Sequence, residues 1–347
     1  MISNIVYLNE LVHLHLRDDP HQGLRIWSDL FDQYLQAWDI KGCYQLLREI
    51  RRLDPITEAG SIAYFLNKTA QGTLAAQTRD WETAIRVYEA LLAITPEENL
   101  GWTLSNLGNV YYLSNEYNKA LETYSRALDE YDKGSDSSGL ARVLINLGSI
   151  YRDMGEIKKA IQSLKRASQI IPDEDLETKV INLVNWANAL QVSEDLVLAE
   201  EKYLQALQCL NKFHAPHLLA QVLGNIGTLY IAIGNPTKAL EYLLQDLALH
   251  QQLDDLPGQG ETLNNLGLAY SRMKEIDKAL YFYTQSAQIR NDLGDVKGEL
   301  TTWSNYLIAV INNSGPTPIE VLQKAKELAV KMDDIQTVNW FESLETG

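Results

Sequence analysis

The sequence predicts an all-α protein, an α-solenoid of about eight stacked helix-turn-helix units. The first observation is an Asn that recurs every 39 or 40 residues, at Asn106, Asn146, Asn185, Asn225, Asn265 and Asn305. The second is a small residue with the same spacing, at Ala120, Ala160, Ala199, Ala239 and Ala279. Self-similarity at one fixed period of this length is typical of stacked supersecondary units. The third observation is that no segment shows the polar–apolar alternation of a strand.

Composition narrows the class of protein. The 347 residues are 46% hydrophobic and 22% charged, which is typical of a folded chain. The net charge of −16 makes nucleic acid and anionic membrane surfaces unfavourable partners. No apolar run is long enough to span a membrane, and the first residues lack the basic region of a signal peptide. Cys43 and Cys209 fall in different repeats, so we expect unpaired thiols and a cytoplasmic location.

The repeats divide the chain into three expected segments. Residues 1–20 are predicted to form an N-terminal capping helix, residues 21–331 the repeat array, and residues 332–347 a C-terminal cap. The last repeat, which begins near Gly298, has the atypical turn "NNSGPTPIE". Terminal repeats are expected to be atypical because one of their faces meets water.

Each repeat in the array has recognisable positions. A degenerate first unit and a clearer second unit carry Trp27, Leu30, Tyr34 and Cys43, then Gly72, Trp81, Ala84, Tyr88 and Pro96. The third unit carries Leu107, Gly108, Tyr111, Tyr117, Ala120, Tyr124 and Ala127. The fourth carries Leu144, Leu147, Gly148, Tyr151, Gly155, Ala160, Leu164, Ala167 and Pro172. We expect Gly and Ala where the two helices of a hairpin cross, since a larger side chain would hold the backbones apart.

This pattern resembles the tetratricopeptide repeat, in which Leu-Gly-x-x-Tyr is followed by Ala-x-x-x-aromatic. Units of about 40 residues are similar to those of kinesin light chains and of bacterial peptide-sensing regulators. The resemblance implies a right-handed superhelix whose concave side is lined by the first helix of each hairpin. Two units depart from the pattern: Trp186-Ala187 replaces Leu-Gly, and Asp246 stands where Ala is expected.

The recurring Asn is the strongest indication of function. Helical periodicity places it on one stripe of each first helix with the residues four and one before it and three, six and seven after it. An amide offers donors and an acceptor together, so it can pair with both the N–H and the C=O of an extended peptide. In the families named above, Asn at this place holds a peptide backbone, and the resemblance implies the same role here.

The stripe contains other candidate binding residues. Additional amides are Asn109, Asn188 and Asn264, and basic residues that would select an acidic side chain or C-terminus are Arg142, Arg152 and Arg272. Trp102 and Tyr112 are candidate apolar anchors, with Ile181 and Val184 as further apolar contacts. The stripe is nearly neutral although the protein is acidic, which suits a peptide recognised through its backbone.

The sequence thus predicts a non-catalytic module that binds a peptide or partner protein in an Asn-lined concave groove. Two alternatives remain open. The chain could be an assembly scaffold that uses its convex face or caps, with the Asn residues only fixing the stacking of hairpins. It could also be a peptide-responsive sensory module acting on a separate effector. Apolar residues of the C-terminal cap, namely Trp340, Phe341 and Leu344, make a homodimer contact possible there.

No motif indicates an enzyme. The sequence lacks a nucleophile elbow, a P-loop, an HExxH metal motif and a dinucleotide fingerprint. His214 and His217 are spaced as two metal ligands could be, but no nearby Cys, Asp or third His completes a site. We expect them in the turn before a helix that begins near Pro216. Asp254 and Asp255 are expected to be solvated in a linker between hairpins. No cofactor and no metal are predicted.

Overall fold

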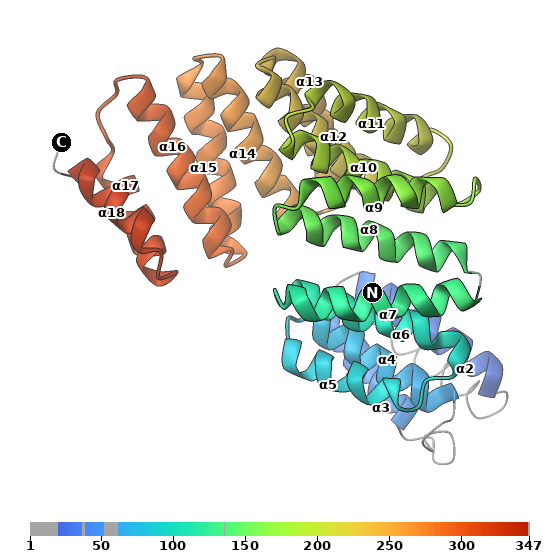
Figure 1. The fold of residues 1–347 in the computed structure, drawn as a ribbon. Helices are drawn as coiled ribbons and strands as arrows, with labels where there is room; N and C mark the ends of the chain where they lie inside the picture. The colour runs from blue at the N-terminus through green and yellow to red at the C-terminus, as the bar shows by residue number, and fades with distance from the viewer. Residues whose placement is uncertain (1–19, 37–38, 52–61, 135, 346–347) are drawn as a thin grey trace. The chain divides into compact units, whose positions relative to one another are not determined.

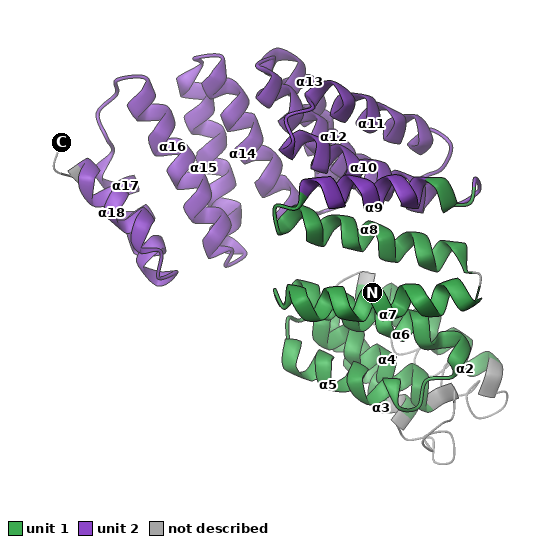
Figure 2. Cartoon of the chain, viewed as in Figure 1, with its two compact units in different colours: residues 1–156, 169–172 green, residues 157–168, 173–347 purple. Residues whose placement is uncertain are grey.

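The computed structural model describes residues 20–36, 39–51, 62–134 and 136–345. These residues form 17 helices and no strands, so the predicted all-α fold is confirmed (Figure 1). They belong to two compact units, shown in Figure 2: residues 1–156 with 169–172 form unit 1, and residues 157–168 with 173–347 form unit 2. The expected N-terminal capping helix lies almost entirely outside the described residues.

Unit 1 is a succession of helix pairs in which each helix packs against the next. Its helices are α2 (Pro20–Gln36), α3 (Ile40–Arg51), α4 (Ile62–Gln77), α5 (Trp81–Leu92), α6 (Glu97–Leu113), α7 (Tyr117–Gly134) and α8 (Ser137–Asp153). The first helices of successive hairpins also contact each other, α2 with α4 and α6 with α8. A side chain on one first helix can therefore reach the next first helix directly.

Unit 2 repeats this arrangement. Its helices are α9 (Ile157–Ile170), α10 (Leu176–Val192), α11 (Leu196–Leu210), α12 (Pro216–Ile233), α13 (Pro236–Gln252), α14 (Leu256–Arg272), α15 (Ile276–Asp292), α16 (Val296–Asn312), α17 (Ile319–Lys331) and α18 (Ile335–Glu345). The first helices α10, α12, α14 and α16 contact one another in succession. The predicted start of a helix near Pro216 is confirmed, with His214 in the turn before it and His217 in its first turn.

Glycines stand where the helices of a hairpin cross, as predicted. A Cβ atom at Gly108 would lie 2.7 Å from Cε1 of Tyr124, and one at Gly267 would lie 2.6 Å from the ring of Tyr283. Both distances are shorter than a carbon contact permits. The aromatic ring of the second helix therefore occupies the space that a side chain of the first helix would need.

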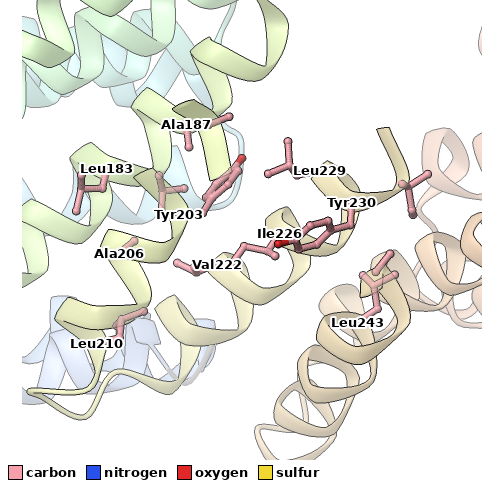
Figure 3. Packing of buried hydrophobic residues seen from close by; sticks show 14 of the residues in the cluster. Leu183, Ala187, Tyr203, Ala206, Leu210, Val222, Ile226, Leu229, Tyr230 and Leu243 are labelled. Carbon is pink, nitrogen blue, oxygen red and sulfur yellow. The ribbon is translucent and has the colours of Figure 1, made fainter. Parts of the chain in front are cut away.

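The core of unit 2 lies between successive hairpins. Figure 3 shows Tyr203 and Leu210 of α11 beside Val222 and Ile226 of α12, with Leu243 of α13 beyond them. All are buried. The helix α12 is also long and apolar enough to cross a membrane by length and composition alone, but a buried core helix passes the same test. Its side chains pack in this cluster, which accounts for its hydropathy.

Aspartates begin four of the first helices, α8, α10, α14 and α16. The side chains of Asp136, Asp175, Asp255 and Asp295 each accept a hydrogen bond from the backbone N–H three residues further on. This is the N-cap arrangement, which satisfies one of the free N–H groups of the first turn. Asp255 is therefore an ordered cap of α14, not the solvated linker residue that the sequence suggested.

The C-terminal end differs from the expected cap surface. Phe341 is 0% exposed and packs in a cluster with Leu322, Ala325 and Ala329, while Trp340 and Leu344 are partly buried against the same cluster. The prediction that Phe341 forms part of an exposed dimer contact is wrong for this residue. Its side chain closes the end of the core.

The tight turns between paired helices need one residue with a positive φ. Gly155 and Gly234 fill this place in two hairpins, whereas Glu194 and Lys274 fill it in others, with φ of 63° at both. A residue with a side chain costs about 1–2 kcal/mol in the left-handed region, and replacing it with Gly removes this cost. Part of the gain is lost again because Gly has more conformational entropy in the unfolded chain. We expect Lys274→Gly to raise the free energy of unfolding by about 0.5 kcal/mol in urea titrations. The same substitution at the exposed helical position Lys297 should lower it.

Candidate functional site

The six recurring Asn residues all lie half-buried at one register of successive first helices. We define the Asn face of unit 1 as Trp102, Asn106, Tyr112, Arg142, Asn146 and Arg152. We define the Asn face of unit 2 as Asn185, Asn188, Asn225, Asn265, Arg272 and Asn305. Some of these side chains form hydrogen bonds that hold neighbouring hairpins together, and others remain available to bind a ligand.

In unit 1, Asn146 bonds to the neighbouring hairpin. Its Nδ2 donates to Oδ1 of Asn109 over 2.8 Å, which joins α8 to α6. The same oxygen accepts a hydrogen bond from the hydroxyl of Tyr124 on α7. Burial raises the pKa of Tyr124, so this hydroxyl stays protonated as a donor. Asn109 and Asn146 thus fix the stacking of two hairpins, the scaffolding role that the sequence left open.

Arg152 and Tyr112 are joined through a carboxylate. The guanidinium of Arg152 lies 2.8 Å from Oδ1 of Asp153, and the hydroxyl of Tyr112 donates to Oδ2 of Asp153 over 2.5 Å. Burial and the adjacent Asp153 carboxylate raise the pKa of Tyr112. Arg152 already has an anionic partner, so Arg142, which is exposed, is the better placed of the two arginines for an incoming acidic group.

Trp102 is the largest exposed apolar side chain of the unit 1 face, at 37%. Its ring lies 6.1 Å from the ring of Phe65 on the preceding first helix α4. Asn106, one turn after Trp102, donates to the Trp102 carbonyl over 3.0 Å, which leaves its oxygen unbonded among the described residues. An apolar surface and an amide acceptor therefore adjoin. The sequence pattern did not indicate Phe65, because its repeat carries no Asn at the recurring position.

In unit 2, several amides of the stripe are used internally. Asn188 accepts from the hydroxyl of Tyr203, the counterpart of the Asn109–Tyr124 bond. Asn305 donates to Oδ1 of Asn264 over 3.0 Å, which joins α16 to α14. Asn264 is only 8% exposed, so it lies in the packed side of the helix rather than on the open face that the sequence predicted for it. The expected apolar contact Val184 is likewise buried.

The amide of Asn225 stands apart from these. It lies on α12 between the helices that carry Asn185 and Asn265, is half-buried, and makes no side-chain hydrogen bond to another described residue. Asn265 accepts one long contact of 3.4 Å from Asn264, while Asn185 donates to the carbonyl of Ile181 over 3.0 Å. Arg272 is exposed at the end of α14.

Among the described residues, no group of three or more His, Cys, Asp and Glu side chains could hold a metal ion. The two cysteines are buried thiols without a disulfide. Burial raises the pKa of Cys43 to about 11, so its thiol stays protonated and unreactive at neutral pH.

Comparison with known proteins agrees with this architecture. No curated protein matches the sequence. Among solved structures, the apo form of the quorum sensor NprR from B. thuringiensis superposes with a TM-score of 0.70 at 13% identity, covering 94% of this chain and 99% of NprR. A Rap protein complexed with competence and sporulation factor gives 0.62 at 11% identity, covering 96% of each chain. BtubC from P. vanneervenii gives 0.53 at 21%, covering 65% of this chain and 92% of BtubC.

These structural likenesses concern the fold alone, because the identities are low. The sequence match is more specific. The family described as tetratricopeptide repeat matches residues 65–133, 99–173, 180–252 and 218–292, which together make up more than half of the chain. The chain therefore belongs to the tetratricopeptide-repeat family.

Proposed function

We propose that this protein is a non-catalytic interaction module that binds an extended peptide segment of a partner protein on the Asn face of one of its units. Membership of the tetratricopeptide-repeat family supports a protein or peptide partner. The solved Rap protein of the same fold is complexed with competence and sporulation factor, and NprR is described as a quorum sensor. These proteins make peptide sensing a reasonable use of the fold.

The observation that carries the proposal is the free amide of Asn225. It stands at the recurring register, half-buried, without a side-chain partner among the described residues. An amide that only fixed stacking would bond to the neighbouring hairpin, as Asn146 and Asn305 do. In our proposal Asn225 pairs with an N–H and a C=O of the peptide, and Asn265 continues the contact on the next first helix.

Side-chain selectivity follows from the charged and aromatic groups on the Asn face of each unit. Arg272 in unit 2 and Arg142 in unit 1 are exposed cations that suit a carboxylate of the peptide. Trp102 with Phe65 provides an aromatic contact in unit 1. The peptide that fits best therefore combines an extended backbone with at least one acidic residue.

The proposal predicts which amide matters for binding. A library of random 12-residue peptides displayed on phage would be selected on the wild-type protein, and the affinity of the selected peptides measured by calorimetry. Removing the Asn225 and Asn265 amides with an Asn225→Ala/Asn265→Ala variant should weaken binding at least tenfold, because two or more hydrogen bonds of about 1 kcal/mol each are lost. Its free energy of unfolding should change by less than about 0.5 kcal/mol.

Asn305→Ala is the matched contrast, since it removes the same amide at the same register from an internal hydrogen bond. It should lower stability by about 1 kcal/mol. Methylating individual backbone nitrogens of the selected peptide gives a second test, because a methyl group at the N–H held by Asn225 should weaken the wild type but not the double variant. Equal affinity of both proteins for every selected peptide would exclude the Asn face of unit 2 as the site.

A further inference from the structure

The sixth repeat buries a carboxyl where other repeats place a small side chain. Ala127 and Ala206 occupy this position in two other hairpins and are 0% exposed, and Ser286 occupies it in the next repeat. Asp246 on α13 is only 2% exposed at the same position. A buried carboxyl is costly unless it is hydrogen-bonded or neutralised, so its surroundings show what stabilises it.

The carboxyl of Asp246 touches both first helices that flank it. Its Oδ2 accepts a hydrogen bond of 2.7 Å from the hydroxyl of Thr262 on α14. On α12 it lies against Gly224, where a Cβ atom would be only 2.8 Å from Oδ2. Gly224 immediately precedes Asn225, and Thr262 is three residues before Asn265. One carboxyl is therefore in contact with the two helices that carry the available amides of the unit 2 face.

The imidazole of His250 lies between two carboxylates. Its Nε2 is 3.1 Å from Oδ1 of Asp246, and its Nδ1 is 2.8 Å from Oδ2 of Asp255. The other oxygen of Asp255 caps the backbone N–H of Gly258. A neutral imidazole carries a single N–H, so it can donate to only one of the two carboxylates. Oδ1 of Asp246 has no hydrogen-bond partner among the described residues, so its contact with Nε2 is an ion-pair distance, which is favourable only when the Asp246–His250 pair holds an additional proton.

The charges around Asp246 favour that proton. Burial raises the pKa of Asp246 to about 6, and the negative charges of Glu261 and Asp255 on α14 act in the same direction, while Thr262 and His250 oppose it. On α12 the contact is the backbone of Gly224. The next repeat has no such proton site, because Ser286 bonds to Thr302 and Arg290 bonds to Asp295 instead.

We propose that Asp246 and His250 form a proton-operated joint that holds α13 against α12 and α14. With that additional proton, the buried carboxyl of Asp246 is neutralised within the pair and the joint is closed. Without it, Asp246 is a buried carboxylate beside the carboxylate of Asp255, and the joint opens more readily. The joint holds α12 and α14, which carry Asn225 and Asn265, in position, so pH would regulate peptide binding on the Asn face of unit 2. This consequence rests on the proposed function, whereas the joint itself does not.

The direction of the effect follows from linkage. The pKa of Asp246 lies near 6 in the folded state and at 3.8 when the side chain is free, so the closed joint binds more protons than the open one in this interval. The closed joint is therefore most stable below pH 3.8, and it loses stability as the pH rises through about 6. Between pH 5 and pH 7.5 the opening equilibrium constant should increase about tenfold.

Hydrogen exchange of the full-length protein, resolved to individual helices and corrected for intrinsic exchange rates, measures this opening directly. Amides of α13 and α14 in the wild type should lose about tenfold in protection from pH 5 to pH 7.5, while those of α10 and α11 should not change with pH. Asp246→Asn mimics the protonated pair, because its amide can donate to Nε2 and still accept from Thr262. This variant should keep the high protection at both pH values.

Asp254→Asn is the matched control, since it removes the same charge from an exposed residue in the turn between α13 and α14. It should respond to pH like the wild type. If Asp246→Asn does not fold, Asp246→Ser, which introduces the side chain of the next repeat, provides the pH-independent variant. The proposal is overturned if protection of α13 and α14 in the wild type does not depend on pH, or if the Asp246 variant shows the same dependence as the wild type.

Discussion

Replacing Phe341 with Ala is expected to lower the free energy of unfolding by about 3–5 kcal/mol, the largest single-substitution effect that we expect for this chain. The ring of Phe341 is fully buried by α16 and α17, with Leu307 and Leu322 in the same cluster. It also contacts the ring of Trp340 at a centroid distance of 4.8 Å. The truncation removes these contacts and leaves a cavity among the side chains of this cluster. Urea denaturation followed by circular dichroism measures the loss.

Ile335 provides the matched control at the same end of the chain. It is 66% exposed on α18, so Ile335→Ala should change stability by less than about 0.5 kcal/mol. Light scattering of both variants addresses the dimer contact that the sequence suggested. If Phe341→Ala altered the molar mass in solution while stability stayed constant, Phe341 would belong to a contact between copies and not to the core.

The periodic residues made the fold predictable from the sequence. The requirement at a helix crossing is local and steric, so a Gly at position 108 and an aromatic residue at position 124 are enough to indicate the hairpin. The same holds for the register of the six Asn residues, which follows from helical periodicity alone. The all-α architecture and its helix pairs could therefore be derived from the sequence, and the same positions carried the resemblance to the family.

The partners of polar side chains could not be derived in this way. Asn109 and Asn146 are 37 residues apart, and their hydrogen bond depends on how closely α6 and α8 approach. Asn264 lies one residue from the recurring register, and that rotation of about 100° is enough to bury it. Asp255 looked like a solvated linker residue because its role as a cap and as a partner of His250 depends on the turn geometry. Helical periodicity predicts the face of the helix on which a side chain lies, but not the atom with which it forms a hydrogen bond.

A second large effect is expected at Asn182 on α10, where replacement by Val should raise the free energy of unfolding by about 1–3 kcal/mol. Asn182 is 0% exposed, and neither its Nδ2 nor its Oδ1 has a hydrogen-bond partner among the residues that the structure describes. An unpaired buried polar group costs about 1–3 kcal/mol, because it loses water without replacement. Val143 and Val222 occupy the same register in the flanking repeats and are buried, so the site accepts Val. Asn and Val have similar helix propensities, so the gain reports on the amide.

The contrast with Asn188 on the same helix makes the Asn182 prediction specific. Asn188 accepts from the hydroxyl of Tyr203, which is itself fully buried, so Asn188→Val should lower stability by about 1 kcal/mol or more. One substitution, made twice in a single helix, is thus expected to act in opposite directions, and urea denaturation of both variants gives the two signs. A loss of stability in Asn182→Val would show that the amide is hydrogen-bonded in solution, for instance to a buried water. A gain of stability in Asn182→Val and a loss in Asn188→Val would show that the role of each amide depends on its own hydrogen-bond partners. For the same reason the binding proposal rests on Asn225 and not on the whole recurring set.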